Sequence, residues 1–145
     1  MGPDLLFLLN DEDEATGECK MQHVNFFSGR STFEERRPIE VCLKLICLVS
    51  DNRKHIYAIG GLTLSAKESS YRVDRYDTTT DQWKLMPRLN QGRGAASACL
   101  IGDIIYVIGG VIKTDGEWNI VNSIEKYSLA SNPKSRPAVQ LIELD

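Results

Sequence analysis

The hexapeptide Ile-Tyr-Ala-Ile-Gly-Gly at residues 56–61 returns 49 residues further on as Ile-Tyr-Val-Ile-Gly-Gly at residues 105–110. A second motif repeats behind it: Val-Asp-Arg-Tyr-Asp at residues 73–77 is matched by Ile-Glu-Lys-Tyr-Ser at residues 124–128, at an offset of 51. The second copy therefore carries a slightly longer connection between its two motifs. A period of about 50 residues, with the insertion confined to a loop, is typical of a structural repeat.

Each copy of the repeat predicts β-strands. Short runs rich in β-branched and aromatic residues are separated by Gly, Asp and Asn, which favour turns. In residues 104–108 both faces of the strand are apolar, so the strand requires cover on two sides, as in a stack of sheets. The expected strands are residues 41–49, 56–59, 71–76, 95–101, 104–108 and 123–127.

The residues between the two Gly-Gly motifs follow a specific order: Tyr76, Trp83, Met-Pro at residues 86–87, Arg93, and then the next apolar strand. This order resembles the kelch repeat, in which each unit forms one four-stranded blade of a β-propeller. The resemblance implies that residues 95–101 and 104–109 are the first two strands of the second blade and residues 123–128 the third. We therefore expect an all-β protein, a kelch-type β-propeller fragment of about two four-stranded antiparallel blades with an irregular acidic N-terminal segment.

The resemblance also assigns structural roles. The aromatic residues are expected to fill the core, the Gly pairs to allow sharp turns and close approach, and the arginine to bond backbone carbonyls. These motif residues are Tyr57, Gly60, Gly61, Tyr76, Trp83, Arg93, Tyr106, Gly109, Gly110 and Tyr127.

The pattern divides the chain into three parts. Residues 1–38 are expected to be an acidic, poorly structured segment, since residues 1–40 hold nine acids and four bases. Residues 39–130 hold the kelch repeats. Residues 131–145 form an atypical tail, because Trp83 has no counterpart after Tyr127, where Lys134 stands.

Two blades are fewer than the four to eight that close a propeller and remove exposed sheet edges. The sequence therefore resembles part of a propeller, for example a truncated or alternatively spliced product. We expect the isolated chain to be aggregation-prone or only partly ordered.

The composition excludes several classes of protein. With 145 residues, 42% hydrophobic and 26% charged, the chain is globular in composition, and its longest apolar runs are too short to span a membrane. Residues 41–145 mix eleven acids with thirteen bases, unlike a nucleic-acid-binding domain. No signal peptide is recognised, so we expect reduced cysteines and a cytoplasmic, or alternatively nuclear, location.

Catalytic chemistry is sparse. His23 and His55 are the two histidines, and we expect His55 to be a surface turn residue. A metal site from Cys19, His23, Cys42 and Cys47 is disfavoured because Cys42 and Cys47 would point to opposite faces of one strand. We expect no catalytic residues, no metal and no cofactor, and we interpret Cys99 as an apolar filler.

Binding residues are expected on the loops that join the second and third strands of each blade, residues 62–70 and 111–121. Both loops mix charged and apolar residues, and both should emerge on one rim of the propeller. Trp118 is either an interface anchor or a side chain that folds back onto its own loop. The expected partner-binding residues are Lys67, Glu68, Lys113, Asp115, Glu117 and Trp118.

These expectations favour a non-enzymatic protein-interaction module. In the kelch-like proteins, which this pattern resembles, an N-terminal BTB domain engages a cullin ubiquitin ligase and the propeller selects the substrate. Residues 1–40 are too few for a BTB domain, so this chain would hold part of the substrate-binding half. The expected partner is a ligase substrate or a cytoskeletal protein. The alternatives are a fragment of a kelch-type oxidase or sugar epimerase, and a truncated isoform without independent function.

Overall fold

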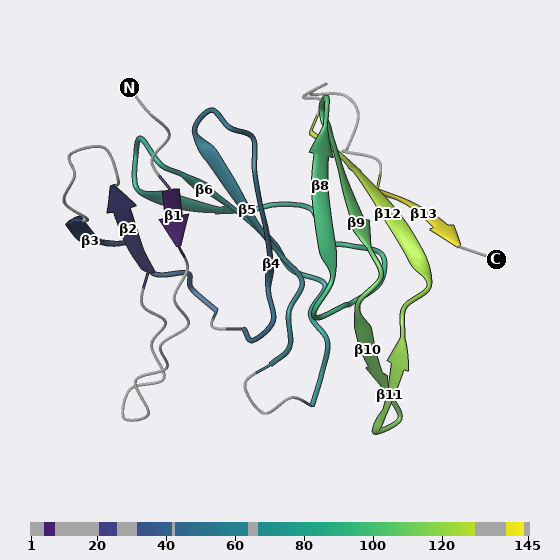
Figure 1. The fold of residues 1–145 in the computed structure, drawn as a ribbon. Coiled ribbons are helices and arrows are strands. Elements are labelled where there is room, and N and C mark those ends of the chain that lie inside the picture. Colours follow the sequence, from purple (N-terminus) through teal and green to yellow (C-terminus); the bar gives the residue numbers. More distant parts are fainter. Residues whose placement is uncertain are drawn as a thin grey trace.

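The computed structural model describes residues 5–7, 21–25, 32–41, 43–63, 67–129 and 139–143 of the chain. Two four-stranded antiparallel sheets, here called blade 1 and blade 2, stand side by side (Figure 1). Blade 1 contains β4 (Cys47–Ser50), β5 (His55–Ile59), β6 (Val73–Asp77) and β7 (Gln82–Leu85). Blade 2 contains β8 (Ser97–Ile101), β9 (Ile104–Ile108), β12 (Ser123–Ser128) and β13 (Val139–Glu143).

The repeat in the sequence is therefore a repeat in the structure. In both blades the strand before the Gly pair is a central strand, β5 or β9, and the strand with the second motif, β6 or β12, pairs with it antiparallel. The expected all-β architecture of about two four-stranded antiparallel blades is confirmed.

The main core lies between the two blades. Tyr57, Ile59 and Val73 of blade 1 pack in one cluster with Ile105 and Val107 of blade 2, and other members of the cluster include Cys47, Leu89 and Tyr127. Because successive side chains point to opposite faces of a strand, the alternating residues of β5 and β9 supply this layer. Burial of two facing apolar surfaces is what holds one blade against the other.

The opposite face of blade 1 is covered by the chain that precedes it. Ile39 and Ala58 form a second buried cluster with Ile46 and Trp83 packed against it. The indole nitrogen of Trp83 donates a hydrogen bond to the carbonyl oxygen of Arg37 at 2.8 Å. The segment before β4 therefore acts as a cover for this sheet.

The outer face of blade 2 has no such cover among the described residues. Tyr106 is half-buried there, Ile108 and Cys99 are exposed, and Ile101 exposes 64% of its surface. The expectation that Tyr106 is a core residue is therefore wrong, as is the interpretation of Cys99 as an internal filler. Tyr57 occupies the equivalent position in blade 1 and is buried because blade 2 packs on it.

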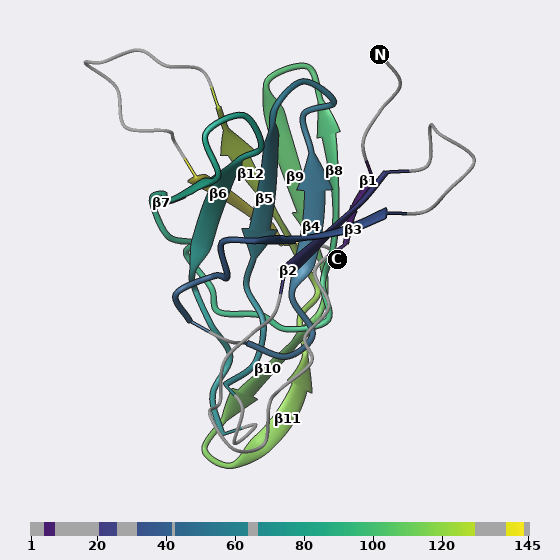
Figure 2. The same cartoon turned by 90° about the vertical axis from the view of Figure 1, so that its left-hand side faces the viewer.

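The ends of the chain contain strands that the sequence analysis did not predict. β1 (Leu5–Phe7), β2 (Met21–Asn25) and β3 (Thr32–Arg36) form a three-stranded antiparallel sheet within the segment expected to be irregular (Figure 2). β13 pairs with β12 inside the expected tail. Blade 2 therefore extends beyond residue 130, the boundary drawn from the loss of the tryptophan pattern.

Candidate functional site

The candidate site is the end of the two blades where the connections between their second and third strands meet. In blade 2 this connection is not an irregular loop but a hairpin of β10 (Val111–Thr114) and β11 (Glu117–Ile120), which extends beyond the sheets (Figure 1). The hairpin turn is Asp115-Gly116, and both residues have positive φ, 53° and 83°. An Asp-Gly pair with two positive φ values matches the twist of the flanking strands. The dipeptide between β-branched and aromatic runs was the signal that the sequence analysis missed.

The two connections contact each other through Ser69. The Ser69 hydroxyl donates to the carbonyl oxygen of Val111 at 3.3 Å and accepts a hydrogen bond from the backbone N–H of Lys113 at 3.1 Å. Ser69 itself is buried. The expected position of both connections on one rim is therefore seen directly, and a buried hydroxyl fixes the hairpin against the neighbouring blade.

Trp118 is the largest exposed side chain on this rim, with 46% of its surface exposed. It lies opposite Lys113 in the hairpin register, and the Lys113 ammonium sits 5.0 Å from the centre of the indole ring. This cation–π contact holds the ring in one orientation before binding, so that less side-chain entropy is lost when a partner binds. Trp118 therefore contacts its own hairpin through Lys113 while almost half of its surface remains exposed.

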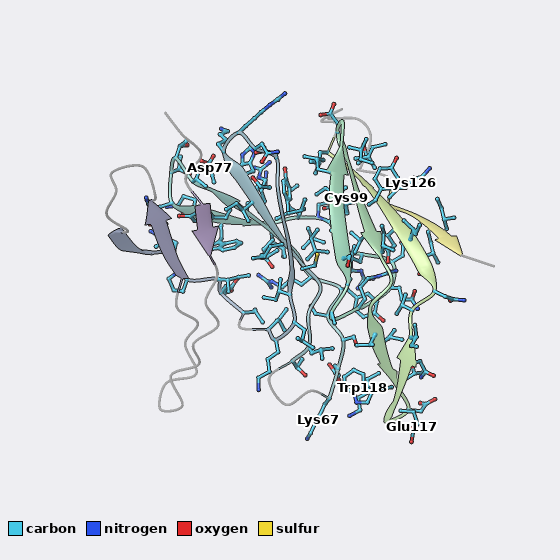
Figure 3. The ribbon with its side chains drawn as sticks, in the orientation of Figure 1. Lys67, Asp77, Cys99, Glu117, Trp118 and Lys126 are labelled. Atoms are coloured by element: carbon cyan, nitrogen blue, oxygen red, sulfur yellow. The ribbon has the colours of Figure 1, made fainter. Side chains whose placement is uncertain are left out.

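The charged candidates surround this tryptophan. Lys67 and Glu68 are exposed on the 62–70 connection, and Asp115 and Glu117 are exposed at the hairpin tip. Figure 3 shows Lys67, Glu117 and Trp118 at the same end of the molecule, with Asp77 at the other. We refer to Lys67, Glu68, Lys113, Asp115, Glu117, Trp118 and Ile120 as the rim surface. Ile120, which sequence reasoning missed, exposes 85% of its surface.

The structural motif residues hold the blades that support this surface. Tyr57, Tyr76 and Tyr127 are buried as expected, whereas Trp83, like Tyr106, is only half-buried. Burial and a 2.6 Å hydrogen bond to the Asp81 carboxylate raise the pKa of the Tyr76 hydroxyl well above its usual range. The glycines Gly60, Gly61, Gly109 and Gly110 all have positive φ.

Gly60 shows why a glycine is required at the end of β5. A Cβ atom at this position would overlap the carbonyl oxygen of Arg93, which comes from the connection between the blades. That same carbonyl accepts a hydrogen bond from the N–H of Gly61 at 2.8 Å. The Gly pair therefore permits a close backbone contact between blade 1 and the connection that leads to blade 2.

Arg93 is fully buried and bonds to blade 2 from that connection. Its guanidinium donates to the carbonyl oxygens of Gly109 at 3.0 Å and Ser123 at 3.1 Å, as expected for a structural arginine. It also pairs at 3.0 Å with Glu125, which is equally buried. Glu125 in turn accepts hydrogen bonds from the N–H groups of Asn90 and Gln91.

The acid at this position, which sequence reasoning missed, has a counterpart in blade 1. Asp74 is buried in β6 where blade 2 has Glu125, but its partner, at 2.7 Å, is Arg72, which lies just before β6 in the connection from β5 rather than in the connection between the blades. Burial outweighs this partner and raises the pKa of Asp74. The repeated Asp74/Glu125 position therefore pairs with a cation from a different connection in each blade.

The end of blade 1 opposite the rim surface carries a carboxylate-histidine cluster. His55 lies 2.9 Å from Asp51 and 3.6 Å from Asp77, and all three side chains are less than one-fifth exposed. The expectation that His55 is a surface residue is therefore wrong. Burial raises the pKa of Asp51, but hydrogen bonds from the backbone of residues 53–55 and from the His55 ring outweigh burial. The net effect is a pKa of Asp51 below its ordinary value. Hydrogen bonds from Thr79 hold the pKa of Asp77 far below its usual range.

The described residues were compared with the requirements of a metal site and of a membrane-spanning helix. Within those residues, no group of three His, Cys, Asp or Glu side chains is placed to hold a metal ion. Cys19 and Cys42, two members of the disfavoured metal set, lie outside the described residues, as does the side chain of His23. None of the described segments forms a helix long and apolar enough to cross a bilayer.

Comparison with known proteins agrees with this arrangement. The model of the Kelch motif matches residues 53–90 and 92–132, together more than half of the chain. The chain belongs to the kelch-repeat family. It is 32% identical over 101 residues to the Kelch repeat protein M-T9 of Myxoma virus (strain Lausanne), covering 70% of this chain and 18% of that protein.

Other kelch proteins are similar over shorter stretches. The F-box/kelch-repeat protein At5g03020 of Arabidopsis thaliana is 37% identical over 84 residues, which cover 58% of this chain and 23% of that protein. Kelch-like protein 4 of Homo sapiens is 37% identical over 60 residues, which cover 41% and 8%. The chain thus spans less than a quarter of the length of each of these relatives.

The solved structure of YjhT has a similar fold. It superposes with a TM-score of 0.66 over 86% of this chain and 44% of that one, at 10% sequence identity. This agreement concerns the arrangement of the sheets, since few side chains are shared. The two matches to the family model contain β5, β6 and β7 of blade 1 and β8, β9 and β12 of blade 2, three of the four strands of each blade.

Proposed function

We propose that this chain is a protein-binding module that contacts its partner through the rim surface. The observation that carries the proposal is the half-exposed Trp118, held by Lys113 on a hairpin that extends beyond the blades. Large aromatic side chains fixed on a rigid element and surrounded by polar groups are frequent anchors of protein interfaces. Kelch repeats are commonly interaction modules, which supports the same role.

The finer proposal is that the rim surface belongs to the substrate-selecting part of a ubiquitin-ligase adaptor. It is supported by the similarity to kelch-like proteins and to a relative whose name combines kelch repeats with an F-box. In this role the chain binds a substrate, while the ligase is contacted by other parts of the assembly. We place this activity in the cytoplasm or the nucleus, where the thiols of Cys47 and Cys99 would stay reduced.

The test is quantitative co-purification from cells that express the full chain. Trp118→Ala and Lys67→Ala should each reduce capture of the same partner proteins, because both changes alter the rim surface without touching the core. Lys84→Ala is the matched control, since Lys84 is exposed on β7 of blade 1. If both rim variants retain every partner at the level of the control, the proposed function is wrong.

The adaptor role has a separate readout in the same experiment. Ubiquitin-ligase subunits should be recovered with the original chain, and ubiquitination of a captured partner should fall in the Trp118→Ala variant. Partners lost from Trp118→Ala without any change in their ubiquitination would leave a binding module that is not a ligase adaptor.

A further inference from the structure

The hydrogen-bond pattern of the β10–β11 hairpin determines which backbone groups point outward. The N–H of Val121 donates to the carbonyl oxygen of Gly110 at 2.9 Å. In an antiparallel pair, hydrogen-bonded and non-hydrogen-bonded residue pairs alternate. By the register of the hairpin, Trp118 and Ile120 both belong to non-hydrogen-bonded pairs. Their N–H and C=O groups therefore point away from β10.

The two edges of this hairpin differ. On β10 the outward groups are already used: Val111 exchanges two backbone hydrogen bonds with Gly94, and the Lys113 N–H donates to Ser69. On β11 the outward groups of Trp118 and Ile120 make no hydrogen bond to any other described residue. Within the part of the chain that the structure describes, β11 is therefore a free sheet edge beside a fixed one, and a free edge is a template for a further strand.

The side chains along this edge form two distinct rows. Trp118 and Ile120, the two exposed apolar residues, lie on one face because they are two residues apart in the strand. Glu117 and Asn119 lie on the other face and are exposed. Neither Glu117 nor Asp115 at the tip makes an ion pair with another described residue. The edge thus offers an apolar row and a polar row that contains the Glu117 carboxylate.

We propose that β11 receives an extended segment of a partner protein as an added antiparallel strand. This inference rests on the proposed function of the rim surface and specifies the sequence pattern that the partner must present. Residues of the segment opposite Trp118 and Ile120 exchange backbone hydrogen bonds with them and place apolar side chains on the same face. The residue opposite Glu117 is Lys or Arg. Read from its N-terminus, the segment is apolar, any residue, apolar, basic.

A basic segment fits this edge better than a second copy of the chain. In an antiparallel pairing of two β11 strands centred on Asn119, Glu117 would face Val121 of the other copy. That pairing leaves both Glu117 carboxylates without a cation and brings two acidic hairpin tips into one sheet. A Lys or Arg in the segment instead supplies the cross-strand opposite charge that stabilises a paired edge.

The probe is the fluorescein-labelled peptide Thr-Val-Thr-Phe-Lys-Thr, titrated with the full chain by fluorescence anisotropy. N-methylation of Val or Phe removes a donor that faces β11, and each should weaken binding about two- to tenfold. N-methylation of the Thr between them is the control, since its N–H points away from the edge. Equal effects at all three positions, or no binding of the unmodified peptide at millimolar concentration, would overturn the proposal.

Variants of the chain give an independent measurement. Ile120→Pro removes one outward donor without touching the hydrogen bonds inside the hairpin, whereas Ile120→Thr keeps that donor and the β-branched shape. Binding should be lost in the first and be weakened only a few-fold in the second, with unchanged circular dichroism in both. If Ile120→Pro disturbs the fold, Glu117→Lys decides: it should reject this probe and accept the same peptide with Glu in place of Lys.

The outcomes separate this inference from the function on which it rests. If capture of a partner requires Trp118 but the partner competes neither with the labelled probe nor with its Glu-containing counterpart, strand addition is refuted. The rim surface would then still be a binding site. Concentration-dependent dimers that the peptide does not dissociate, measured by light scattering, would show that a second copy occupies the edge instead.

Discussion

Replacing Arg93 by Met should destabilise the chain more than any other single change in the connection between the blades. The substitution keeps a long apolar side chain but removes the guanidinium, so the carbonyl oxygens of Gly109 and Ser123 lose a donor. It also leaves the fully buried carboxylate of Glu125 without its cation. Removing one partner of a buried ion pair costs about 3–5 kcal/mol. At roughly 2–4 °C per kcal/mol for a domain of this size, the melting temperature should fall by about 6–20 °C.

A double-mutant cycle isolates the ion pair from the rest of the change. Glu125→Gln keeps an oxygen for only one of the two hydrogen bonds that Asn90 and Gln91 donate to the separate carboxylate oxygens, and it leaves Arg93 as a buried cation without a counter-charge. Each single variant should be strongly destabilised. The double variant Arg93→Met/Glu125→Gln should be less destabilised than the sum by at least about 1 kcal/mol, because the residues are in direct contact.

The measurement is urea unfolding of the full chain followed by circular dichroism, with the same slope against denaturant required of all four proteins so that only stability is compared. A loss below about 1 kcal/mol for Arg93→Met, or strictly additive effects in the cycle, would refute the argument that this pair fastens the connection to blade 2.

Three further predictions concern other parts of the molecule. Gly60→Ala should cost several times the roughly 1–2 kcal/mol expected for Gly102→Ala, because both glycines have positive φ but only Gly60 would bring a Cβ against backbone; thermal unfolding of the two variants compares them, and equal losses would contradict the close contact. Ile101→Lys combined with Ile108→Lys should reduce self-association without lowering the melting temperature, since both side chains lie exposed on the uncovered face of blade 2. If light scattering shows unchanged self-association, this face is not the surface through which the chain associates. The pKa of Asp77 lies below its ordinary 3.8 in the folded chain, so its ionised form stabilises the fold above about pH 4, and this contribution is lost as the pH falls through the folded-state pKa. Asp77→Asn should therefore flatten the loss of stability between about pH 4 and pH 2. An unchanged dependence of stability on acid pH would exclude a stabilising role of the Asp77 carboxylate.

The interior of the repeat followed from local pattern, and its outer boundary did not. The central strands β5 and β9 could be located because apolar runs ending in Gly-Gly are a local signal. β13 was missed because its sequence lacks the tryptophan of the pattern, yet it forms a strand since β12 offers it an open edge. An edge strand depends on its neighbour more than on its own residues.

The candidate site divides in the same way. The residue types of the rim surface, with Trp118 among charges, were visible in the chain. The free edge of β11 was not, because it depends on the hairpin register and on Ser69 and Gly94 occupying the other edge. Ile120 was overlooked since an isoleucine in a loop gives no sign of being exposed until its strand partner is known.

By itself, the sequence determined that the chain is built from kelch units, since alternating apolar residues, paired glycines and regularly placed aromatic side chains act over short distances and need few neighbours. Only the tertiary structure decided that Tyr57 is buried while Tyr106 is not, and that Arg93 pairs with Glu125. Those outcomes depend on which sheet stands against which face. Burial and desolvation are properties of packed surfaces, and no single segment of the chain carries them.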